Sequence, residues 1–213
     1  MNNNRAYRII AVVALMLGVV GVTLGYSAFS SNLTISSSAE VKPEGSKFNV
    51  DFSSSSSSVQ TENIVPSLST TATGFTATDA EIDNDGDPVI TNLKATFTEP
   101  GQSVQYSFYA YNLGEYVAYL NSISFIGSKS CTAKTGTDQT LVDSACNGIS
   151  LSIKVGNEEV TTASVNSITN HTLGVNSAEP IIVTISYASG SAIADGDFDV
   201  TLPSIKLTYE SAD

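Results

Sequence analysis

The chain has no tryptophan, one histidine, two cysteines and few charged side chains. A single histidine excludes metal sites built from several histidines and leaves few routes to general acid–base catalysis. Charged residues make up 14% of the 213 residues, against about 25% in typical soluble domains. Nine residues are Lys or Arg and 21 are Asp or Glu, so the net charge is −12. This balance excludes DNA and RNA as partners, because a phosphate backbone needs a basic surface. These absences favour an extracellular protein that is not an enzyme.

The first thirty residues carry an export signal. Arg5 and Arg8 precede an apolar run from Ile9 to Gly25 whose only polar member is Thr23. The positive-inside rule places the N-terminus in the cytoplasm and everything after this run outside. Two interpretations remain open for residues 1–30. They form either a single-pass membrane anchor, through which the protein contacts the membrane, or a signal segment whose cleavage releases a secreted protein.

Beyond residue 31, apolar residues alternate with polar ones, which is typical of strands. The clearest stretches are residues 48–52, 75–82, 104–110, 180–187 and 198–209. No amphipathic helix is indicated. We predict an all-β fold, an antiparallel β-sandwich of Ig-like or jelly-roll-like type, preceded by one N-terminal hydrophobic helix. The sandwich forms one extracellular domain over residues 31–213, with a serine-rich linker at 53–58 and a bulge or edge at Pro203.

The inward positions of these strands define the expected core. The candidates are Val104, Tyr106, Phe108, Ala118, Leu120, Ile123, Phe125, Val183, Ile185, Val200, Leu202 and Leu207.

Two neighbouring stretches carry a recognisable pattern. Residues 95–108 hold a Pro100-Gly101 turn followed by alternating apolar residues, and residues 112–120 read Asn-Leu-Gly-Glu-Tyr-Val-Ala-Tyr-Leu. This pattern resembles that of bacterial surface β-sandwich domains. The leader ending at residues 25–31 is similar to that of TasA/camelysin-type biofilm fibre proteins. The resemblance implies an exported β-sandwich subunit that assembles into extracellular fibres, and it carries no catalytic residues.

Cys131 and Cys146 flank a polar segment rich in Thr, Asp, Ser and Gly. After export, such a pair predicts a disulfide, and the alternative is two separate thiols. Closing a loop of this size stabilises a protein by roughly 3 kcal/mol in the chain-entropy account.

An acidic stretch is the only candidate metal site. Glu81, Asp83, Asp85 and Asp87 alternate as at the start of a calcium loop, but Asn92 stands where the bidentate glutamate belongs. A polar hairpin turn explains the same residues, so we expect no metal and keep calcium as the weaker interpretation.

Two outward tyrosines are candidates for an interaction surface. If Tyr106 and Phe108 face the core, Tyr109 and Tyr111 face outward and can form a cross-strand ladder or contact a partner. His171 follows no nucleophile motif and is expected to be a loop histidine.

These features predict a cell-surface or secreted structural or interaction protein, such as a fibre subunit or an adhesin. It would associate with its own copies or with other surface proteins. The alternative is a secreted carbohydrate-binding module or hydrolase, for which Tyr would have to replace the missing Trp.

Overall fold

The computed structural model describes residues 47–85, 88–161 and 171–211, and the backbone of residues 30–35. The predicted N-terminal hydrophobic helix lies outside these residues. Within the described part of the chain, no helix has the length and apolar character needed to cross a membrane.

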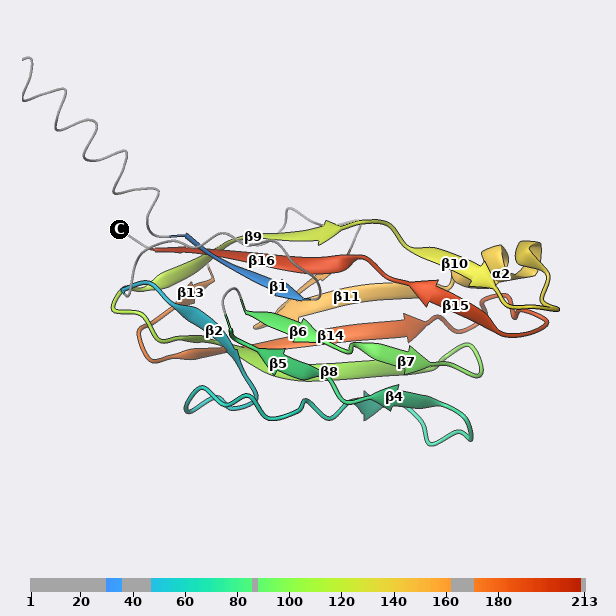
Figure 1. Cartoon of the computed structure of the whole chain (residues 1–213), viewed down its shortest axis with the longest axis horizontal. Coiled ribbons are helices and arrows are strands. Elements are labelled where there is room, and N and C mark those ends of the chain that lie inside the picture. Colours follow the sequence, from blue (N-terminus) through green and yellow to red (C-terminus); the bar gives the residue numbers. More distant parts are fainter. Residues whose placement is uncertain (1–29, 36–46, 86–87, 162–170, 212–213) are drawn as a thin grey trace, which may run out of the picture.

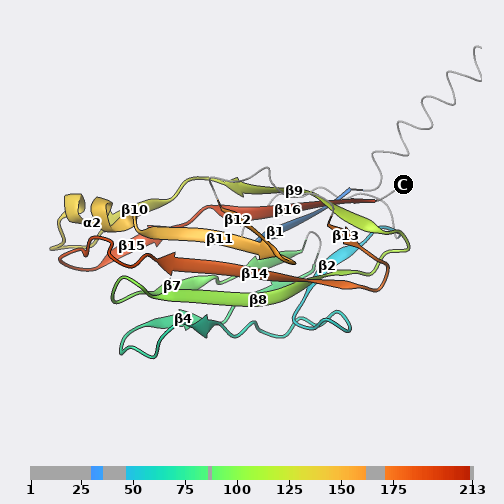
Figure 2. The same ribbon diagram turned by 180° about the vertical axis from the view of Figure 1, so that it is seen from behind.

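Two sheets stacked face to face form the body of the molecule (Figures 1 and 2). The first sheet has the order β13-β9-β16-β1-β6-β5, and the second has β12-β11-β14-β8-β2 with β3 also beside β8. The first-sheet strands are β13 (Thr172–Leu173), β9 (Ala118–Ile126), β16 (Ser204–Ser211), β1 (Ser30–Ile35), β6 (Val89–Thr91) and β5 (Glu81–Asp83). The second-sheet strands are β12 (Glu158–Thr161), β11 (Ile149–Val155), β14 (Ala178–Tyr187), β8 (Ser103–Asn112), β2 (Val50–Ser53) and β3 (Ser67–Leu68).

Two short ribbons continue the first sheet beyond the end of β1. One pairs β10 (Ser130–Ala133) with β15 (Phe198–Thr201), and the other pairs β4 (Thr76–Thr78) with β7 (Lys94–Thr96). Both breaks have a local cause. Pro203, which has no N–H to donate, separates β15 from β16, and Asn92, with a φ of 62°, separates β6 from β7.

The all-β prediction is confirmed, and the strand pairs are antiparallel except for one. β1 runs antiparallel to β16, with Ile35 opposite Ile205, and parallel to β6, with Ile35 opposite Ile90. The first described strand therefore lies in the middle of a sheet rather than at its edge.

A short helix, α2 (Gln139–Cys146), is the element that the sequence analysis missed. The Asp138 side chain caps it by accepting a hydrogen bond from the N–H of Thr140. Its inward-facing residues Val142 and Ala145 are buried. The polar residues between the two cysteines hid this single apolar face.

The segment predicted as a serine-rich linker is a closed loop packed on the second sheet. Ser53 is fully buried, and its hydroxyl donates to the carbonyl of Ser58 at 2.8 Å. It also accepts from the N–H of Gln60 at 3.1 Å. These bonds fold the serines back on themselves, so they do not separate two parts of the domain.

Most of the predicted core is buried as expected. Of the twelve candidates, only Phe125, Val200 and Leu202 remain partly exposed. Val200 and Leu202 both lie at the junction of β15 and β16, beyond the end of β1.

Candidate interaction site

Within the described residues, the first sheet has no strand between β7 and β15. β1 fills the space between β16 and β6 and is described as far as Ile35, whereas β7 and β15 continue past this residue (Figure 1). Within the described residues, β7 pairs only with β4 and β15 only with β10. A cavity of about 700 Å³ lies between these two strands. We call it the open slot.

The floor of the open slot belongs to the second sheet. Ile149 of β11 and Ile185 and Tyr187 of β14 line it. Its sides carry the inward residues of the two flanking strands, Ala95 with Phe97 on one side and Phe198, Val200 and Leu202 on the other. These apolar side chains share the cavity lining with polar and charged ones, including Lys94, Asp195 and Asp197.

Burial differs between β16 and the stretch of chain that leads into it. Ile205 and Leu207, whose backbone pairs with β1, are 1% and 0% exposed. Phe198, Val200 and Leu202 are only partly buried. Ile205 and Leu207 belong to the main apolar cluster, whereas Phe198 and Val200 pack against the smaller cluster of Ala145, Ile149 and Tyr187, and Leu202 packs against both.

Aromatic rings cluster at one side of the slot. The ring of Phe97 stacks on Phe75 with centroids 5.7 Å apart and meets Tyr187 edge-to-face at 6.3 Å. Charged side chains stand at the rim, where Lys134 lies 3.2 Å from Asp199. An inserted segment would thus meet apolar groups below and polar groups at the edges.

The β7 side of the slot is held by one buried tyrosine of the second sheet. The Tyr106 hydroxyl donates toward the carbonyls of Lys94 and Thr78 at 2.8 and 3.0 Å and accepts from the N–H of Lys94 at 3.1 Å. Burial raises the pKa of Tyr106, so the hydroxyl stays protonated. It joins both strands of the β4–β7 ribbon to β8.

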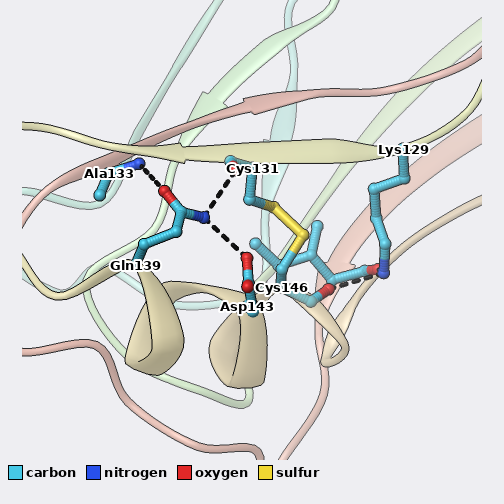
Figure 3. The surroundings of a disulfide bond; sticks show 7 residues. Lys129, Cys131, Ala133, Gln139, Asp143 and Cys146 are labelled. Carbon is cyan, nitrogen blue, oxygen red and sulfur yellow. Dashed lines mark hydrogen bonds between the residues drawn. A yellow bond between two sulfur atoms is a disulfide. The ribbon is translucent and has the colours of Figure 1, made fainter.

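The β15 side is held through the disulfide that the sequence predicts. Cys131 of β10 is bonded to Cys146 at the end of α2 (Figure 3). The Gln139 amide bonds the backbone of β10, accepting from the N–H of Ala133 and donating to the carbonyl of Cys131. The Lys129 ammonium donates to the carbonyls of Cys146 and Ile149, both at 2.6 Å.

The two tyrosines proposed as a surface are placed differently from each other. Tyr109 is half-buried, but Tyr111 is 6% exposed. The Tyr111 hydroxyl lies 3.4 Å from the carbonyls of Ser57 and Asn176. The prediction that Tyr111 is exposed is wrong, because the serine loop covers this part of the outer face.

The acidic stretch forms a polar turn as far as the structure describes it. Glu81 and Asp83 are exposed on β5, and the Asp83 carboxylate accepts from the N–H of Asp85 at 2.9 Å. Asp87 lies outside the described residues. No three His, Cys, Asp or Glu residues within the described ranges are grouped to hold a metal ion.

His171 is not a simple loop histidine, because it lies between two glutamates. Its Nδ1 contacts Glu179 and its Nε2 lies 3.5 Å from Glu158. Burial lowers the pKa of His171, but the hydrogen bonds and charges of Glu179 and Glu158 outweigh it and raise the pKa above its usual value. The group links β12, β14 and the start of β13.

The slot residues were not identified as a site from the sequence. The stretches 89–97 and 198–209 both alternate normally, so each predicts an ordinary strand with an inward face. Only Asn92 and Pro203 mark the two breaks, and neither residue shows that the breaks face each other.

Comparison with protein-family models, curated proteins and solved structures finds no match to this chain.

Proposed function

We propose that this chain is an exported structural protein whose copies associate by strand addition, with the open slot as the receiving site. The observation that carries the proposal is that, among the described strands, β7 and β15 each have one edge without a partner, on either side of an apolar floor. An extended segment inserted there would hydrogen-bond to both edges and cover the half-exposed side chains of Phe198, Val200 and Leu202.

The geometry next to the slot suits a single strand. β1 pairs with both β16 and β6, so these two strands stand two strand spacings apart, about 9.5 Å. β7 begins three residues after the end of β6, and β15 ends three residues before the start of β16. The slot thus continues the path of β1.

The residues that follow β1 begin beside the slot, at Ile35, but end far from β15. They leave β1 at Ile35 and rejoin the described chain at Lys47. The Lys47 carbonyl accepts from the N–H of Glu115, three residues before Ala118, which pairs with Ser211. Figure 2 shows β2 and β13 at the end of the sandwich opposite β15. Lys47 therefore lies at the end of the sandwich opposite β15.

Chain length then excludes this segment as the occupant beside β15. Since Ile35 pairs with Ile205, position 39 would face Thr201. From position 39 to Lys47 the chain can span at most about 29 Å. The strand from Thr201 to Ser211 is about 33 Å long. A segment that reached β15 could not return to Lys47, so we assign the occupant to another copy.

A contact of this kind can repeat from copy to copy. The receiving slot and the inserted segment are different parts of the molecule, so the interface is heterologous and extends head to tail unless the copies close into a ring or exchange segments reciprocally. This agrees with the fibre-subunit role that the resemblance implies. The export signal and the disulfide support a location outside the cytoplasm.

The experiment compares two tryptophan substitutions in the β4–β7 ribbon, one inside the slot and one outside it. The full chain, extracted from cell surfaces in mild detergent, is sized by light scattering over a range of concentrations. We expect the size to grow with concentration for wild type and for Thr76→Trp, the control in the same ribbon, which changes an exposed position of β4 that does not line the slot. Ala95→Trp fills the slot and is expected to stay monomeric. A wild-type monomer at every concentration, or normal assembly of Ala95→Trp, would contradict the proposal.

A further inference from the structure

The β15 side of the open slot is a thin wall. Within the described residues, β15 is paired on one edge only, by four residues of β10. Cys131 lies directly opposite Val200, whose side chain lines the slot. An isolated two-stranded ribbon is marginally stable at best, so the position of β15 depends on what holds β10.

What holds β10 is the end of α2, and α2 leads directly to the floor of the slot. Cys146 is three residues before Ile149, which lines the floor. Ala145, beside Cys146, packs with Ile149 and Tyr187 in one buried cluster. The disulfide therefore connects the wall of the slot to its floor covalently, by a short path.

We propose that the Cys131–Cys146 disulfide is a positioning element of the open slot, and that strand uptake is weakened when it is reduced. This rests on the proposed function. With the bond broken, β10 keeps the Gln139 hydrogen bonds and the Lys129 bridge. Just beyond its end, the N–H of Lys134 and the hydroxyl of Thr137 still donate to the carbonyl of Asp197. All of these are exposed or partly buried hydrogen bonds that water can replace.

The opposite wall gives an internal reference. β7 is held by the buried hydroxyl of Tyr106 and does not involve the disulfide. Reduction should therefore loosen β10 and β15 and leave β4 and β7 unchanged. A general loss of stability would instead affect both walls and the sheets together.

The first measurement is amide hydrogen exchange of the full chain, before and after treatment with a phosphine. The phosphine is oxidised to its oxide while the two sulfurs become thiols. We expect amides of β10 and β15 to exchange at least about tenfold faster after reduction, as in local opening. Amides of β4, β7, β8 and β14 should keep their rates. Equal protection of β15 in both states would overturn the proposal.

The second measurement is assembly, with three controls. The double variant Cys131→Ser/Cys146→Ser should need a concentration at least about tenfold higher than wild type for assembly. This tenfold change corresponds to about 1.4 kcal/mol in the free energy of association. Reoxidation of reduced wild type should restore assembly. Leu173→Ala, a buried position at the other end of the sandwich, lowers stability without touching the slot and should assemble normally while folded.

The outcomes separate the two proposals. If oxidised wild type does not assemble, strand addition is wrong, and the exchange experiment still tests whether the disulfide orders β15. If oxidised and reduced proteins assemble equally, strand addition stands and the positioning role is wrong. If Leu173→Ala loses assembly as the double variant does, the effect is one of global stability, and the positioning role is again wrong.

Discussion

Filling the open slot with a tryptophan tests whether the space between β7 and β15 is empty in the folded protein. Ala95 is partly buried, lines the slot and packs against the main apolar cluster. The cavity of about 700 Å³ beside it has room for an indole ring. In a closed core the same substitution would overpack the site.

The sign of the stability change distinguishes these cases. Burying a large apolar side chain contributes about 1.5–3 kcal/mol. The slot is open on its outer side, so about half of this is gained, and ordering the side chain opposes it by roughly 0.5–1 kcal/mol. We expect Ala95→Trp to change the free energy of unfolding by about 0 to +1 kcal/mol. Overpacking a filled site would instead destabilise by about 1–3 kcal/mol or more.

The assay is urea unfolding of the oxidised protein, with two reference variants. Thr76→Trp lies on the exposed face of β4, outside the slot, and should stay within about 0.5 kcal/mol of wild type. Ala118→Trp places the same ring at a position with 0% exposure in the first sheet and should destabilise the protein strongly. A loss of more than about 1 kcal/mol for Ala95→Trp would refute the open slot, because it would mean that another group already fills the space.

Three further predictions test other parts of the structure. Because the pKa of His171 is raised in the folded protein, its contribution to stability is complete below about pH 6.5 and is lost as the pH rises through the folded pKa. The urea midpoint should therefore fall from pH 6 to pH 8, less so in Glu158→Gln, and an NMR titration of the single histidine that shows a pKa below 6.5 would contradict this. Asp138→Ala removes the cap of α2 and should lower the free energy of unfolding by about 1 kcal/mol, measured by urea unfolding; an unchanged midpoint would show that the cap is not needed. Gly114→Ala places a Cβ 2.8 Å from the backbone of Asn49, so we expect a loss of about 1–3 kcal/mol by the same assay, and a neutral result would mean that the two segments are not in contact.

Composition and alternation determined much of this protein in advance. Period-two patterning in residues 104–110 and 180–187 requires one buried face, and Val104, Tyr106 and Val183 are fully buried. The two cysteines flank a short polar segment, so their pairing needed only local reasoning, and the bond is present. These conclusions depend on neighbours along the chain, which the sequence displays directly.

Other features depend on which strands meet, and alternation carries no information about that. Phe198 and Ile205 both lie in alternating stretches, yet Phe198 is only partly buried, whereas Ile205, beside which β1 runs, is fully buried. Tyr111 was expected to be exposed because it faces away from Tyr106 on the strand, but a loop from 54 residues earlier covers it. The open slot exists only because β7 and β15, about a hundred residues apart in sequence, extend past the same point. Pairing between distant segments is set by the packing of the whole sandwich, and only the tertiary structure decides it.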